Sequence, residues 1–220
     1  MKTIPYLKVR ISGLLTGIML LTMMPFMAVA ENAPEQAAVS KSVAMYSLGM
    51  PWDQFLASTR AHRDTWQKNS GREVPPGLVD RFKRAGNDLR LLVITADWCL
   101  DSLHSVPYIA KLASGAGVEM RLVNFKTGKS IMDLHHTPDG RASTPTVILL
   151  RGDKEVAAWV ERPASLQWWY LDMADKIGDK ELLERKMSWY DWNRGSDMLT
   201  EIVVLAELTA KKATSASASH

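Results

Sequence analysis

The stretch LRLLVITADWCLDSLHSVPYIAKL, residues 89–112, decides the fold and holds the only cysteine of this 220-residue chain, Cys99. Residues 89–95 are a continuous apolar run of strand length, which predicts a buried central strand. The spacing of apolar residues over 100–114 predicts a helix directly after it. Cys99 therefore lies between a buried strand and the first turn of a helix.

The chain after this stretch predicts a mixed sheet followed by helices. An alternating segment and an apolar segment predict two further strands, at 118–125 and 144–150. The segment RGDK predicts a turn that pairs a last strand, 155–161, back as a hairpin. Helices are expected at 163–177, 179–191 and 196–211, and the low-complexity end, 211–220, is expected to be disordered.

The chain before the stretch divides into three parts. Residues 1–30 have a basic start, an apolar middle and Ala28-Val29-Ala30, which predicts a signal peptide cleaved after Ala30. The alternative is an uncleaved membrane anchor, and both interpretations place the rest outside the cytoplasm. A polar linker is expected over 31–44. A helical segment is expected over 45–88, with one helix at 46–69 and another at 78–86.

The net charge of the chain changes when the predicted leader is removed. The whole chain has 27 basic and 24 acidic residues, and residues 1–30 hold three of the basic ones and none of the acidic ones. The remainder therefore has 24 of each. A neutral chain gives no support for a nucleic-acid partner, and a membrane partner is expected only if the leader is retained.

The position of Cys99 favours a reactive thiol. Free backbone N–H groups and the dipole at a helix start stabilise an anion, and a thiolate is such an anion. The alternative from position alone is a buried, inert cysteine. An exported domain with one cysteine has no internal disulfide, so a hydrophobic core must stabilise it.

The spacing around Cys99 resembles that of the thioredoxin superfamily. The pattern Trp98-Cys99-x-x-Ser102 is followed by Pro107 inside the helix and by Thr144-Pro145 before a strand. The resemblance implies an α/β thioredoxin-like fold over residues 89–210, in which a central mixed sheet is flanked by helices. It also implies a cis Thr144–Pro145 bond, with Trp98, Thr144 and Pro145 lining the substrate groove beside Cys99.

Further motifs narrow the resemblance to a bacterial subgroup with a single active-site cysteine and a preceding helical segment. The match extends over about residues 45–208, and its motifs are specific as a set rather than singly. They are Asp97-Trp98-Cys99-x-Asp101, Val106-Pro107, Gly140-Arg141, Thr144-Pro145, Glu161-Arg162-Pro163-Ala164 and Trp189-Tyr190.

Two departures from thioredoxin limit the chemistry. Ser102 replaces the second cysteine, and Val93 replaces the buried acid. Only a monothiol cycle remains, in which Cys99 forms a mixed disulfide with a protein or small-molecule thiol. The Ser102 hydroxyl is a candidate donor to the thiolate, or a solvated first-turn serine.

Asp97 and Asp101 flank the thiol and are candidates for proton transfer, although two nearby carboxylates would also disfavour the thiolate. Asp101 is explained more simply as a negative charge at a helix start. No cofactor is predicted. A copper or zinc site built from Cys99 with His104, His135 and His136 is the weakest hypothesis, because the spacing matches no known ligand set.

Two functional hypotheses follow from these residues. The first is an exported thioredoxin-like protein that exchanges thiols and disulfides through Cys99. The second is a redox-inactive thioredoxin-fold module that binds a peptide in the same groove.

Overall fold

The computed structural model describes residues 33–86 and 88–217. The predicted signal peptide, residues 1–30, lies outside them. Four strands form one sheet in the order β2-β1-β3-β4. Their bounds are Leu89–Thr95 for β1, Glu119–Asn124 for β2, Thr146–Arg151 for β3 and Lys154–Val160 for β4. Strand β1 is parallel to β2 and antiparallel to β3, and β4 is antiparallel to β3. The sheet is therefore mixed, as predicted.

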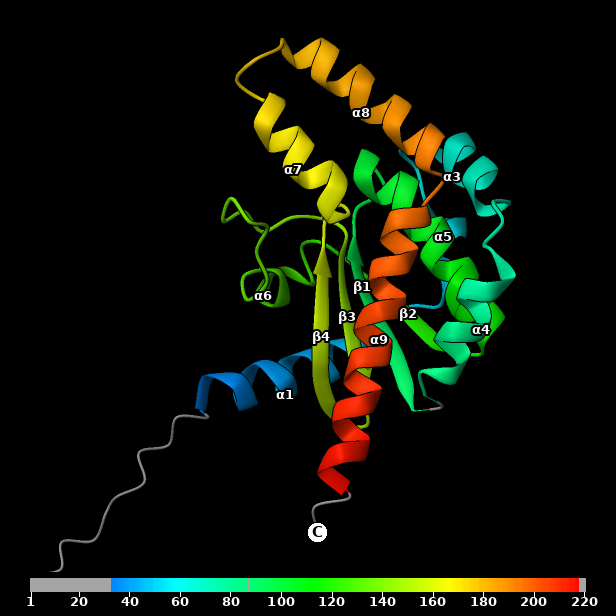
Figure 1. Cartoon of the computed structure of the whole chain (residues 1–220), viewed down its shortest axis with the longest axis vertical. Coiled ribbons are helices and arrows are strands. Elements are labelled where there is room, and N and C mark those ends of the chain that lie inside the picture. The colour runs from blue at the N-terminus through cyan, green and yellow to red at the C-terminus, as the bar shows by residue number, and fades with distance from the viewer. Residues whose placement is uncertain (1–32, 87, 218–220) are drawn as a thin grey trace, which may run out of the picture. The chain divides into compact units, whose positions relative to one another are not determined.

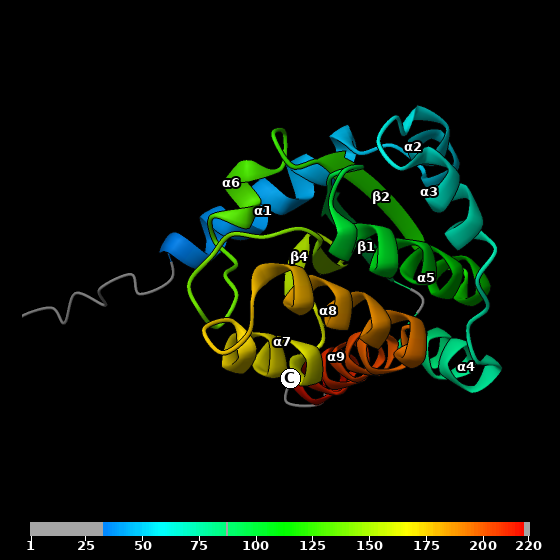
Figure 2. The ribbon, with the colours of Figure 1, turned by 90° about the horizontal axis from the view of Figure 1, so that it is seen from above.

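Helices cover both faces of this sheet (Figure 1, Figure 2). The N-terminal helices are α1, Ala33–Leu48; α2, Trp52–Ser58; α3, Arg63–Ser70; and α4, Pro76–Arg84. The remaining helices are α5, Leu100–Ala116; α6, Lys129–Met132; α7, Ala164–Met173; α8, Asp179–Asn193; and α9, Ser196–Ser217.

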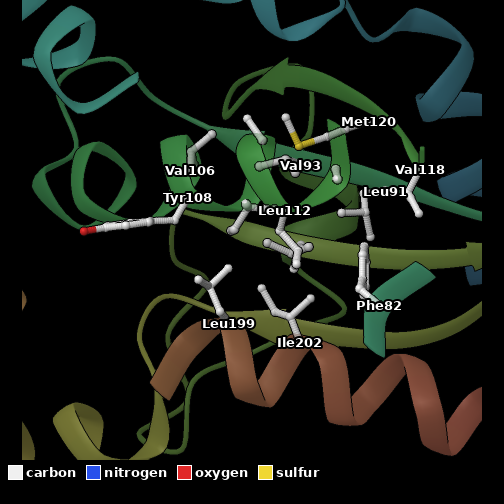
Figure 3. Close-up of a cluster of buried hydrophobic side chains, with 14 of the residues drawn as sticks. Phe82, Leu91, Val93, Val106, Tyr108, Leu112, Val118, Met120, Leu199 and Ile202 are labelled. Atoms are coloured by element: carbon white, nitrogen blue, oxygen red, sulfur yellow. The ribbon is translucent and has the colours of Figure 1, made fainter. Parts of the chain in front are cut away.

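Alternate residues of β1 pack into two separate hydrophobic clusters. Leu91 and Val93 belong to the larger cluster, together with side chains of α4, α5 and α9 (Figure 3). Leu92 and Ile94 belong to the second cluster, against side chains of α1 and α6. Because successive residues of a strand point to opposite faces, a continuous apolar run is what a strand covered on both faces requires.

Most of the predicted linker is helical, as part of α1. Residues 33–44 belong to this helix, and Tyr46 in its last turn is buried against the sheet. Val43 packs against the same cluster, three positions before Tyr46. The prediction of a linker was wrong because the small and polar composition of residues 31–44 hid their continuity with the helical turn that carries Tyr46, which shares one helix face with Val43.

Three further helical regions differ from the prediction by more than a shift of their ends. The expected helix 46–69 is divided into the end of α1, then α2 and α3, and His62 between α2 and α3 has a left-handed backbone with φ of 52°. Helix α6 was not predicted. Helix α9 continues to Ser217, so the expected disordered tail does not begin at residue 211, because the segment contains no glycine or proline that would end the helix.

No helix among residues 33–86 and 88–217 is long and apolar enough to cross a bilayer.

Candidate functional site

Cys99 is the N-cap residue of α5 and is 9% exposed. Its Sγ accepts a hydrogen bond from the backbone N–H of Ser102 over 3.5 Å. The thiol also donates to the carbonyl oxygen of Thr144 over 3.3 Å. The sulfur therefore contacts both the first turn of α5 and the loop that precedes β3.

The thiol lies in a pocket of about 430 Å³. Trp98, Phe125 and Met132 supply aromatic and apolar surface, and the loop before β3 supplies another part of the wall. The polar lining includes three charged side chains, those of Asp101, Glu161 and Lys186. A pocket with an apolar part and a few polar groups is the usual form of a small-molecule or peptide site.

Trp98 and the Thr144–Pro145 loop both border Cys99. The Trp98 side chain is 55% exposed, and its ring meets Phe125 edge to face with centroids 5.4 Å apart. The Thr144–Pro145 bond is cis. The carbonyl oxygen of Pro145 accepts the N–H of Glu161 over 2.7 Å, which fixes the loop to the end of β4. The structure thus places Trp98 and Thr144 in the wall of the Cys99 pocket.

Ser102 contacts the thiol in another way than the sequence predicts. Its backbone N–H, rather than its hydroxyl, points at Sγ. The side chain is fully buried, and its Oγ has no hydrogen-bond partner among the residues that the structure describes. Neither predicted role, a hydroxyl donor to the sulfur or a solvated serine, matches this placement.

The Asp97 carboxylate binds the backbone of the segment between α2 and α3. Its Oδ2 accepts the backbone N–H groups of Arg60 and Ala61 at 2.9 and 3.1 Å. Burial alone would raise the pKa of Asp97, but the backbone hydrogen bonds outweigh burial and lower this pKa below its ordinary value. Its carbonyl oxygen also accepts the indole N–H of Trp66 over 2.8 Å. The carboxylate is thus engaged with backbone and held in its ionised form.

Asp101 is buried and bonded to helix α8. Its Oδ2 is 2.9 Å from the ammonium of Lys186, and the hydroxyl of Tyr190 donates to its Oδ1 over 2.7 Å. The guanidinium of Arg162 lies 3.7 Å from the same Oδ1. Asp101 is in the first turn of α5, as the interpretation of a charge at a helix start requires, and in addition α8 covers it.

Glu161 connects the loop before β3 to this charged cluster. Its carboxylate accepts hydrogen bonds from Arg141 and from the Ser143 hydroxyl, and it pairs with Arg162. Burial opposes ionisation, but these partners lower the pKa of Glu161 below its ordinary value. Burial and the nearby Asp101 carboxylate raise the pKa of Tyr190 well above its ordinary value.

Several residues that line this pocket were not predicted as site residues, among them Phe125, Glu161 and Lys186. Glu161 belongs to a motif that the sequence analysis quoted without assigning it a role. The sequence also contains a pattern that could have indicated Lys186. It lies four residues after Leu182 and four before Tyr190, which places the three side chains on one face of α8, and all three are buried. A lysine within an apolar helical stripe is unusual and indicates a buried partner.

The histidines of the metal hypothesis have separate surroundings. His104 stacks on Tyr190 with centroids 5.0 Å apart, and His135 lies 2.7 Å from the carboxylate of Glu155. Burial, followed by the charge of Arg72, lowers the pKa of His104. Within the described part of the chain, no three His, Cys, Asp or Glu side chains form a group that could hold a metal ion.

Val93, which replaces the buried acid of thioredoxin, is surrounded by apolar side chains in the structure. Val93 is fully buried within the larger hydrophobic cluster (Figure 3). It offers no group that could exchange a proton with Cys99.

Comparison with known proteins agrees with this fold. A family model described as thioredoxin matches residues 49–177, more than half of the chain, and the chain belongs to that family. A crystal structure of a protein of unknown function from Pseudomonas aeruginosa is similar, with a TM-score of 0.54 and 18% identity. The match covers 74% of this chain and 95% of that one.

A crystal structure of an HIV epitope-scaffold protein is also similar, with a TM-score of 0.54 and 18% identity over 74% of this chain and 96% of that one. At such identity the two likenesses establish the fold alone. No curated protein matches the chain.

Proposed function

We propose that this protein is an exported member of the thioredoxin family that exchanges thiols and disulfides through Cys99 alone, within a subgroup that has one active-site cysteine. The observation that carries the proposal is the position of Sγ. The sulfur caps the first turn of α5, faces the Thr144 carbonyl and lies in a pocket of about 430 Å³. This position supplies both stabilisation of a thiolate and room for a partner.

The start of α5 places two groups that can stabilise a negative charge beside the sulfur of Cys99. When Cys99 ionises, the N–H of Ser102 and the positive end of the helix dipole both stabilise the negative sulfur. The hydrogen bond to Thr144 requires the thiol proton, so it is lost on ionisation. The proton passes to solvent or buffer, since Asp97 is engaged with backbone N–H groups and Asp101 with Lys186 and Tyr190.

The proposed cycle has two displacements and no net redox change in the protein. The Cys99 thiolate attacks one sulfur of a partner disulfide, a new S–S bond forms, and the other partner sulfur leaves as a thiolate. A second thiolate then attacks the partner's sulfur in the mixed disulfide and releases Cys99 as a thiolate. The second thiol comes from the same partner or from a small external thiol, because Cys99 is the only cysteine of the chain.

Export supports this chemistry, since disulfides persist outside the cytoplasm. The basic start, apolar middle and Ala28-Val29-Ala30 of the leader support export to the periplasm or beyond. Partner disulfides in proteins or small molecules are available in such a compartment.

The second candidate is a binding module without turnover. The replacement of the second cysteine and of the buried acid favours it, and so does the low exposure of Cys99, 9%. This function predicts that Cys99→Ala leaves partner binding intact, whereas exchange through Cys99 predicts loss of the covalent adduct.

Reaction of the reduced protein with oxidised glutathione tests the proposal. We expect one glutathionyl adduct by intact mass, released by added thiol, and no adduct on Cys99→Ser. The matched control is the same single thiol in the urea-unfolded protein, and we expect the folded protein to react at least about tenfold faster at neutral pH. A folded rate equal to or below the unfolded rate would contradict the proposal.

A further inference from the structure

Helix α8 completes the Cys99 pocket although it lies outside the family match. The match ends at residue 177, and α8 begins at Asp179. Lys186, in the middle of this helix, lines the pocket together with Cys99. Helix α8 therefore adds to the pocket an ammonium group from outside the matched region.

The ammonium of Lys186 has unused hydrogen-bonding capacity. Lys186 is only 7% exposed, and its Nζ donates to one acceptor in the described structure, Asp101 Oδ2, over 2.9 Å. The ring of Tyr170 lies 5.5 Å from Nζ. A lysine ammonium has three N–H donors, so two remain without a protein acceptor. Because Lys186 lines the pocket, a ligand bound there can supply acceptors for these donors.

The two carboxylates that line the pocket already accept hydrogen bonds from protein groups. Both oxygens of Asp101 have donors, Tyr190 on one and Lys186 on the other. The carboxylate of Glu161 accepts from Arg141 on both oxygens and from Ser143 on one. Among the charged side chains of the pocket, the groups available to a ligand are therefore hydrogen-bond donors. A carboxylate of a ligand would accept from them.

The rest of the pocket suits the carbon part of such a ligand. Trp98, Phe125 and Met132 provide apolar surface beside the thiol. A ligand with a sulfur, a short carbon chain and a carboxylate would fit this pocket. Its sulfur would meet Cys99, its carbon chain the apolar surface, and its carboxylate Lys186.

We propose that Lys186 is a specificity-determining residue that selects thiol partners bearing a carboxylate near the sulfur. The inference rests on the proposed exchange through Cys99, because it names the class of thiol that the same pocket accepts. Asp101 is the positioning residue that holds the ammonium in place.

Alkylation with two reagents of nearly equal size tests the inference independently of disulfide exchange. Iodoacetate carries a carboxylate and iodoacetamide a neutral amide, and with either one the sulfur displaces iodide and forms an S–C bond. The measured quantity is the iodoacetate-to-iodoacetamide rate ratio of the folded protein, divided by the same ratio in urea. We expect this quotient to exceed one and to fall about tenfold in Lys186→Met, since a charge-assisted hydrogen bond is lost.

Controls separate this inference from the proposed function and from misfolding. Lys186→Arg should keep the preference, and Lys180→Met, on the same helix with a 91% exposed side chain, should not alter it. The double variant Asp101→Asn, Lys186→Met removes both charges of the buried pair, so neither is left without its partner. It should also lose the preference. A wild-type quotient of one, or an unchanged quotient in folded Lys186→Met or in the folded double variant, overturns the inference even where Cys99 exchanges disulfides normally.

Discussion

The thiol of Cys99 donates a hydrogen bond to the carbonyl oxygen of Thr144, with 3.3 Å between sulfur and oxygen. Strand pairing explains why residues 45 positions apart meet. Strands β1 and β3 are antiparallel, with Ile94 opposite Thr146. The end of β1 therefore lies beside the start of β3, and the segments just beyond these two residues emerge at the same edge of the sheet.

Replacement of Ser102 by alanine should leave the reactivity of Cys99 within about twofold of wild type, since the contact to Sγ comes from the backbone N–H. The buried hydroxyl has no hydrogen-bond partner among the described residues, so its removal should change the free energy of unfolding by less than about 1 kcal/mol. Alkylation kinetics and urea unfolding measure the two effects. A large loss of reactivity with unchanged stability would show that the hydroxyl acts on the sulfur.

Most of the fold could be predicted from local patterns. Strand β1 has the predicted bounds because its apolar run is covered on both faces. The meeting of Cys99 with the loop at Thr144 was implied by the resemblance to the thioredoxin superfamily. Helix α1 could not be recognised by composition alone, since packing of Tyr46 against the sheet stabilises it.

The charged part of the site depends on tertiary packing that no local pattern specifies. Asp101 lies at a helix start, where the sequence predicts a negative charge but not whether it is buried. Its burial depends on α8, which begins 78 residues later in the sequence. The role of Asp97 likewise depends on Arg60 and Ala61, which belong to the segment between α2 and α3.

Replacement of Asp97 by alanine should destabilise the protein by about 1–2 kcal/mol at neutral pH, because two backbone N–H groups lose a carboxylate acceptor. The pKa of Asp97 is lowered in the folded protein, so its stabilisation is complete above the ordinary pKa of 3.8. It is lost as the pH falls through the lower folded pKa.

Urea unfolding of wild type and Asp97→Ala from pH 7 downwards measures this dependence. The difference in the free energy of unfolding should shrink below pH 3.8. Asp64→Ala, an exposed carboxylate in the first turn of α3, is the control and should show a much smaller difference at neutral pH. An Asp97→Ala difference that stays constant down to the acid limit would contradict the assigned role.

Replacement of Gly195 by alanine should destabilise the protein by roughly 2–4 kcal/mol, from a left-handed backbone and overpacking together. Gly195 has φ of +77°, and a Cβ there would lie 2.9 Å from ring carbons of Tyr108. Thermal or urea unfolding measures the loss. Gly77→Ala is the control, since nothing lies within 4 Å of its Cβ position in α4, and it should stabilise by up to about 1 kcal/mol. Equal effects at the two glycines would refute the close approach of Gly195 to Tyr108.

The buried pair of Asp101 and Lys186 should show strong coupling in a double-mutant cycle. Asp101→Asn and Lys186→Met should each cost about 3–5 kcal/mol, because each leaves its buried partner without an opposite charge. The double variant should cost clearly less than the sum, with a coupling energy of about 2 kcal/mol or more.

Urea unfolding of the four proteins gives this coupling energy. The matched control is the exposed pair of Lys180 and Glu184 on the same helix, 3.9 Å apart. Its cycle of Lys180→Met and Glu184→Gln should couple by less than about 0.5 kcal/mol, since water screens exposed pairs. Additive effects at Asp101 and Lys186 would mean that water reaches both charges, and that α8 does not close the Cys99 pocket as the structure describes.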